Sequence, residues 1–103
     1  MRKEVMSFAL TMEEKLCMHD EQRGPTGWKN EPVDYLLNRL SEEVAELRKA
    51  IADGASLNTI NLEAADVGNL AMMVADAHTY QTLPPAGRAA LVKAEEVEDG
   101  GRK

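Results

Sequence analysis

The stretch from Leu36 to Leu47, LLNRLSEEVAEL, constrains the fold of this chain more than any other part of it. Its leucines and Val44 recur at steps of three and four residues, which is the spacing of one face of an α-helix. The same segment carries three acidic residues, Glu42, Glu43 and Glu46. It therefore predicts an amphipathic helix with carboxylates close to its apolar stripe.

Helical spacing of apolar residues continues through most of the chain. We expect three helices and a short fourth one, at residues 2–19, 32–53, 58–78 and 86–97. Asn58 or Thr59 can cap the third helix, and Gly54 can end the second. Gly68 lies inside the third helix, where its missing side chain would let another helix approach closely.

These elements predict an all-α fold, an antiparallel helical bundle, because the short connection at 55–58 turns the third helix back along the second. We expect residues 1–83 to form the helical domain, and residues 84–103 a short C-terminal helix and a flexible tail. Aromatic residues make up only 4% of the 103 residues, so the core must be aliphatic and small. Oligomerisation is expected to complete it.

Charge and composition narrow the classes of partner. The formal net charge of −6 argues against nucleic-acid binding, which needs a basic surface. Because we find neither an apolar run of membrane length nor a signal-peptide pattern, we expect no membrane partner and a cytoplasmic location. Cys17 is the only cysteine, which excludes an internal disulfide and favours a reducing compartment.

A second acidic pair, Glu63 and Asp66, lies in the third predicted helix. At about 100° per residue, both fall within the apolar stripe of that helix rather than opposite it. No Lys or Arg occurs between residues 50 and 87, so these acids have no cationic partner on their own helix. Burying unpaired carboxylates is costly, and a hard divalent cation would offset that cost.

All-oxygen ligands favour Mg²⁺, Mn²⁺ or Ca²⁺ over zinc. The alternative interpretation is a solvated helix face stabilised by ion pairs one turn apart, such as Arg39 with Glu43.

Residues 20–31, DEQRGPTGWKNE, are predicted to form a loop because glycine and proline interrupt the helical spacing. The loop holds the only tryptophan, Trp28, with Arg23 and Lys29 nearby. One large aromatic ring and two cations suit contact with a base and a phosphate. Alternatively, Trp28 closes one end of the bundle, since tryptophan buries a large apolar area.

The spacing of the acids also carries a resemblance. EExxE at Glu42–Glu46 and ExxD at Glu63–Asp66 are separated by sixteen residues, and a GW pair, Gly27 and Trp28, precedes the first motif. With these motifs the chain resembles the MazG-like, all-α nucleoside triphosphate pyrophosphohydrolase superfamily, in particular its compact single-domain members. The resemblance spans about residues 8–80.

The resemblance implies a helical bundle that assembles as a homodimer or homotetramer. It implies Mg²⁺-dependent cleavage between the α- and β-phosphates, which yields a nucleoside monophosphate and pyrophosphate. Four positions match the metal ligands of the family: Glu43, Glu46, Glu63 and Asp66. Glu42 matches the first acid of the motif, which would help to orient water.

The resemblance also suggests substrate contacts. Arg23 is the nearest basic residue before the GW pair, and Asn69 stands where the compact members have a polar residue after ExxD.

The hypothesis that follows is a metal-assisted hydrolase. A water molecule activated by the metal would attack in line, and Glu42 or Glu46 would accept its proton. Trp28 would stack on the base. The phosphate charge would be neutralised by cations drawn from Arg23, Lys29 and Arg39.

Two other functions stay open at this point. A related pyrophosphohydrolase would use the same residues on a phosphoribosyl nucleotide, such as phosphoribosyl-ATP. A non-catalytic helical dimer would instead hold the acids for structural reasons or for binding Ca²⁺.

Overall fold

The computed structural model of the chain describes residues 1–20, 24 and 27–100, the last five by their backbone only. These residues form α-helices and one short 3-10 helix: α1 (Lys3–Cys17), η1 (Gly27–Asn30), α3 (Val33–Ala52), α4 (Leu57–Thr82) and α5 (Pro85–Gly100). No strand occurs among the described residues, so the prediction of an all-α fold is confirmed. Within the same ranges, no helix is both long enough and apolar enough to pass through a lipid bilayer.

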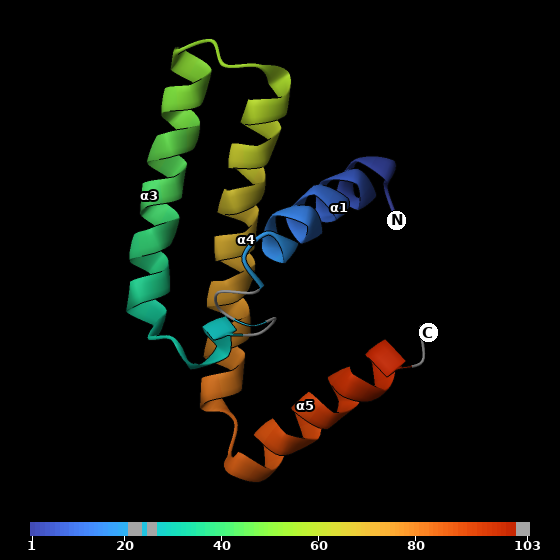
Figure 1. Cartoon of the computed structure of the whole chain (residues 1–103). Helices are drawn as coiled ribbons and strands as arrows, with labels where there is room; N and C mark the ends of the chain where they lie inside the picture. Colours follow the sequence, from blue (N-terminus) through green and yellow to red (C-terminus); the bar gives the residue numbers. More distant parts are fainter. Residues whose placement is uncertain (21–23, 25–26, 101–103) are drawn as a thin grey trace.

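The helices α3 and α4 form a long antiparallel hairpin (Figure 1). Gly54 ends α3 as predicted, and its φ of 70° lies in the left-handed region that glycine adopts without strain. Ser56 caps α4, because its hydroxyl accepts a hydrogen bond from the backbone N–H of Thr59 at 3.1 Å. The prediction that Asn58 or Thr59 would be the cap was wrong, since α4 begins before both of them.

A small aliphatic core lies in the seam between these two helices. Its buried side chains are Leu36 from α3 and Leu70, Met73 and Ala77 from α4. Leu16 of α1, Leu40 of α3 and Trp28 of η1 pack against them. Burial of each large apolar side chain contributes roughly 1.5–3 kcal/mol to the free energy of unfolding. A core of this size therefore gives the hairpin only modest stability.

The helix α1 packs across the middle of α4, where Gly68 allows a close approach (Figure 1). A Cβ atom at Gly68 would lie 2.9 Å from Cε2 of Phe8 and 3.3 Å from Sδ of Met12, so the ring of Phe8 rests directly on the α4 backbone. The amide of Asn69 donates to the carbonyl of Met12 at 3.0 Å and fixes the same contact. The expectation that Gly68 admits a neighbouring helix is confirmed.

The predicted loop at 20–31 contains an ordered 3-10 turn, η1, which helical spacing could not reveal in so short a segment. The side-chain amide of Gln81 on α4 donates to the carbonyls of Lys29 and Glu31, at 3.0 and 2.6 Å. These bonds fasten η1 to α4 and thereby position Trp28.

The last helix, α5, diverges from the hairpin after Pro84 (Figure 1). Arg88 joins it to α4 by donating to the carbonyls of Tyr80 and Gln81, at 3.0 and 2.9 Å. These carbonyls lie in the last turn of α4, and that of Tyr80 also accepts a hydrogen bond from the backbone N–H of Leu83 at 3.3 Å. The helix extends through Gly100, past the predicted end at residue 97, and residues 101–103 of the expected tail lie outside the described residues.

We predict that Gly68→Leu lowers the free energy of unfolding by about 1–3 kcal/mol, because the new side chain must displace the ring of Phe8 and separate α1 from α4. Urea denaturation followed by circular dichroism measures the change. Ala71→Leu is the matched control, since Ala71 is exposed on the same helix. Equal midpoints for the two variants would show that the close contact at Gly68 does not stabilise the protein.

Candidate functional site

Three carboxylates meet across the seam between α3 and α4. Glu43 of α3 faces Glu63 and Asp66 of α4, and each contributes an oxygen to a group whose atoms all lie within 4.8 Å of one another. Glu43 is buried, with 8% of its surface exposed, whereas Glu63 and Asp66 are half-buried. The structure thus brings together three of the four predicted metal ligands. Glu46, the fourth, is exposed one turn along α3 from Glu43.

Two oxygens of this cluster lack a hydrogen-bond partner among the described residues, and both are fully buried. They are Oε2 of Glu43 and Oε2 of Glu63. A buried carboxylate oxygen without a partner is costly in a folded protein. A cation that binds oxygen would satisfy both atoms, and the all-carboxylate donor set fits Mg²⁺, Mn²⁺ or Ca²⁺. The residues present therefore suit a hard divalent cation.

Burial and neighbouring negative charges make Glu43 a weaker acid than an ordinary glutamate. Burial is the largest cause and raises the pKa of Glu43 to about 7; a hydrogen bond to Glu46 and the charges of Glu46 and Asp66 act in the same direction. Arg39 opposes these effects only in part. Glu43 therefore takes up a proton more readily than an ordinary glutamate does, and a bound cation would displace that proton.

Two positively charged side chains flank the carboxylates from different helices. Arg39 of α3 donates to Glu42 at 3.2 Å and to Glu43 at 3.5 Å, which confirms the ion pair expected from their spacing. Lys15 of α1 lies 3.3 Å from Oδ2 of Asp66. The sequence pattern did not indicate this partner, because Lys15 and Asp66 are brought together only by the packing of α1 on α4.

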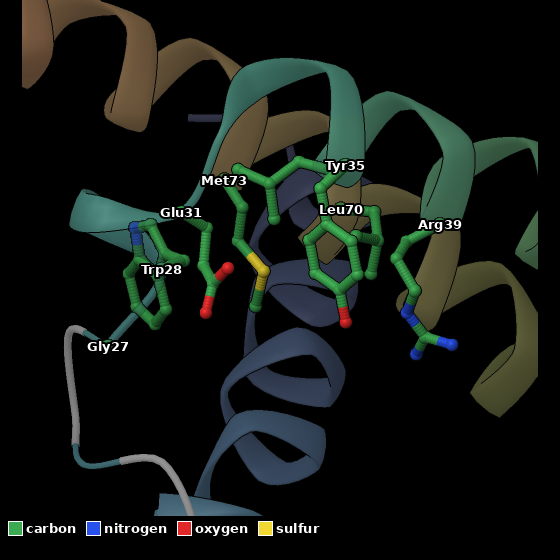
Figure 2. A pocket seen from close by; sticks show the side chains of 8 residues that line it. Gly27, Trp28, Glu31, Tyr35, Arg39, Leu70 and Met73 are labelled. Carbon is green, nitrogen blue, oxygen red and sulfur yellow. The ribbon is translucent and has the colours of Figure 1, made fainter.

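A pocket of about 280 Å³ is lined in part by Arg39, the side chain that pairs with Glu43. Figure 2 shows Trp28 at one end of it and Arg39 at the other, with the ring of Tyr35 and the carboxylate of Glu31 between them. Leu70 and Met73 line it from α4.

A smaller cavity of about 80 Å³ lies against Glu43 and Asp66. It shares Arg39, Leu70 and Met73 with the larger pocket, so the two spaces are neighbours separated by these side chains.

Sequence reasoning missed two residues of the larger pocket, Glu31 and Tyr35. Tyr35 precedes Arg39 by four residues, so the two side chains lie on one face of α3. That spacing could have indicated Tyr35 once Arg39 was placed in the site. Glu31 offered no such signal, since its position depends on how η1 docks on α4.

Trp28 and Lys29 differ in their surroundings although they are adjacent in η1. The indole N–H of Trp28 and the ammonium of Lys29 both donate to Oδ2 of Asp76, each at 2.8 Å. Lys29 is buried and also lies 3.5 Å from Glu95 of α5. Trp28 is half-buried, packs on the core and lines the pocket, so it both closes the bundle end and offers a ring surface.

The remaining predicted substrate contacts fall in different places. Lys29 is absent from the pocket lining and is held by two carboxylates, so we leave it out of the proposed phosphate contacts. Asn69 is buried and lines the smaller cavity, and its buried Oδ1 has no partner within the described part of the chain. Glu42 is exposed beside Arg39. Arg23 lies outside the described residues, and its role stays a prediction.

The chain matches no protein-family model, no curated protein and no solved structure. The carboxylates and the pocket that Arg39 lines are therefore the basis for inferring what the protein does.

The raised pKa of Glu43 predicts a dependence of stability on pH in the presence of EDTA. Because the folded-state pKa of about 7 exceeds the usual value of 4.5, the folded protein retains a proton that the unfolded chain releases. Stability is then full below about pH 4.5 and falls as the pH rises to about 7, by up to about 3 kcal/mol.

Glu43→Gln removes this titration. In urea denaturation with EDTA, the variant should match the wild type at about pH 4 and exceed it in stability at about pH 8. Glu42→Gln, a substitution at an exposed neighbour, should not change the stability at either pH. An identical pH dependence in wild type and Glu43→Gln would show that Glu43 does not carry the proton.

Proposed function

We propose that this protein is a divalent-metal-dependent nucleoside triphosphate pyrophosphohydrolase. It would cleave the bond between the α- and β-phosphates and release a nucleoside monophosphate and pyrophosphate. One observation carries the proposal: Arg39 links a carboxylate cluster, in which two buried oxygens lack a partner among the described residues, to a pocket lined by aromatic rings, because it pairs with Glu43 and also lines that pocket. A cation site beside a ring-lined pocket suits a ligand with a polyanionic end and a planar end.

The cation would be held by Glu43, Glu63 and Asp66, with Glu46 one turn away. Mg²⁺ is the expected ion, and Mn²⁺ has the same ligand preference. When bound, it would supply positive charge that polarises the phosphoryl oxygens and lowers the pKa of a water molecule. The acidic motifs EExxE and ExxD and their resemblance to the MazG-like superfamily support the same assignment.

The side chains around the cluster have separable roles. Arg39 would neutralise phosphate charge, because its guanidinium already lies between the carboxylates and the pocket. Glu46, which is exposed one turn from Glu43, or Glu42 would accept the proton of the attacking water. Trp28 and Tyr35 would stack on the base.

Glu31 adds a carboxylate to the part of the pocket that would hold the base. An ionised carboxylate only accepts hydrogen bonds, so it would pair with an amino group on a base and disfavour a keto oxygen. The substrate panel should therefore include cytosine with uracil and adenine with hypoxanthine, as matched amino and keto pairs.

The test is pyrophosphate release from canonical and modified ribo- and deoxyribonucleoside triphosphates, with Mg²⁺ and with EDTA. We expect release with Mg²⁺ only, and a loss of at least about a hundredfold in kcat for Glu63→Gln with the helix content unchanged. Glu14→Gln, an exposed acid of α1, is the matched control and should keep full activity.

Other outcomes would redirect the assignment. Release from phosphoribosyl-ATP alone would identify the related pyrophosphohydrolase instead. A folded protein that binds Mg²⁺ but releases pyrophosphate from no nucleotide would contradict an enzymatic role and favour a binding or structural one.

We also propose that copies of the chain associate. Large apolar side chains remain exposed on α1, among them Met6 and Leu10, which are 52% and 68% exposed and one turn apart. A single chain leaves these side chains in water, which is typical of a surface that binds a partner. Sedimentation equilibrium should show a dimer or tetramer for the wild type and a shift toward monomer for Met6→Glu with Leu10→Glu. A monomeric wild type at micromolar concentration would refute this.

A further inference from the structure

Lys15 brings a positive charge to the carboxylates from a helix outside the hairpin. Its Nζ lies 3.3 Å from Oδ2 of Asp66. Because α1 crosses α4 while α3 lies along it, Lys15 and Arg39 reach the cluster from two different helices (Figure 1). Neither the acidic motifs nor the helical spacing gives Lys15 a role.

The pair formed by Lys15 is looser than the pair formed by Lys29. The ammonium of Lys29 lies 2.8 Å from Asp76 and its side chain is only 7% exposed, whereas the Lys15 pair spans 3.3 Å with 17% exposure. Lys29 also has Glu95 as a second partner. A lysine ammonium has three N–H donors, so Lys15 retains donors that can turn to a ligand. Of these two lysines, Lys15 is the one free to exchange partners.

The position of Lys15 suits contact with phosphate. It lines the smaller cavity together with Arg39, Glu43, Asp66 and Asn69. Arg39 also lines the larger pocket, so a ligand whose base filled that pocket would direct its phosphates past Arg39 toward Lys15.

The charges at the cluster also favour contact between Lys15 and a phosphate group. The acids around the cluster outnumber its two side-chain cations, Lys15 and Arg39, so the site without metal carries net negative charge that repels a triphosphate. A divalent cation adds two positive charges at the cluster and lowers this repulsion. The ammonium of Lys15 then faces a carboxylate already engaged by a cation, and phosphate oxygens become its better partner.

We propose that Lys15 exchanges partners during the reaction cycle: it pairs with Asp66 before a divalent cation binds, and with the triphosphate afterwards. This inference rests on the proposed function. Lys15 thus competes with the cation for Asp66 in the absence of nucleotide and binds the substrate once the cation is in place.

The exchange of partners predicts that removing the charge of Lys15 strengthens metal binding and weakens substrate binding. Lys15→Met keeps the apolar stem and removes the charge. Isothermal titration with MnCl₂ alone should show affinity tighter by about two- to fivefold, since a partly exposed ion pair no longer competes. In the pyrophosphate-release assay, kcat/KM should fall about ten- to a hundredfold, mainly through a higher KM, since a charged hydrogen bond to phosphate is lost.

Three further variants separate charge from packing. Lys15→Arg keeps the charge, so its Mn²⁺ affinity and its kcat/KM should both stay within a few-fold of wild type. Lys15→Gln is a second neutral variant, which serves if Lys15→Met proves unstable in circular dichroism. Lys3→Met makes the same substitution at an exposed lysine of α1 and should change neither Mn²⁺ affinity nor KM.

The outcomes distinguish this inference from the proposed function. An active wild type with unchanged KM in both neutral variants, or with weaker Mn²⁺ binding in them, would overturn the role of Lys15 alone and leave it a simple ion pair between helices. A wild type that releases pyrophosphate from no nucleotide would overturn the proposed function, and this inference with it.

Discussion

The packing of α3 against α4 is the interaction on which the rest of the structure depends. The seam between them buries the apolar core and, along the same line, brings three carboxylates within 4.8 Å of one another. Hydrophobic burial therefore brings like charges together, and both the burial and the neighbouring carboxylates raise the pKa of Glu43. The free energy that holds the hairpin also preorganises the oxygens, so a cation would meet ligands that need little rearrangement.

Much of this arrangement could be predicted from the sequence, because it follows from spacing within single helices. The positions of Glu63 and Asp66 in an apolar stripe predicted their partial burial, and the short connection after Gly54 predicted the hairpin. Gly68 predicted a close helix contact, although not that Phe8 would make it. Residues that depend on docking between elements, such as Lys15 and Glu31, left no periodic signal.

The adjacent residues Trp28 and Lys29 show why composition alone misassigns a binding loop. Both looked suited to a nucleotide, one by its ring and the other by its charge. In the folded chain a single oxygen of Asp76, on α4, accepts from both of them. This partner lies far along the chain, so no local pattern could reveal that the lysine is neutralised while the ring remains at the pocket. Charge in a loop indicates a ligand only when the fold leaves that charge at the binding pocket.

The shared hydrogen bond at Asp76 has a practical consequence for observing the protein in solution. Trp28 is the only tryptophan, and its indole is oriented by a carboxylate while its ring lines the pocket beside Met73. All tryptophan emission therefore comes from one ring in one environment, at the place where a base would stack. Under the proposed function, the emission of Trp28 would report occupancy of the pocket without a label and without turnover.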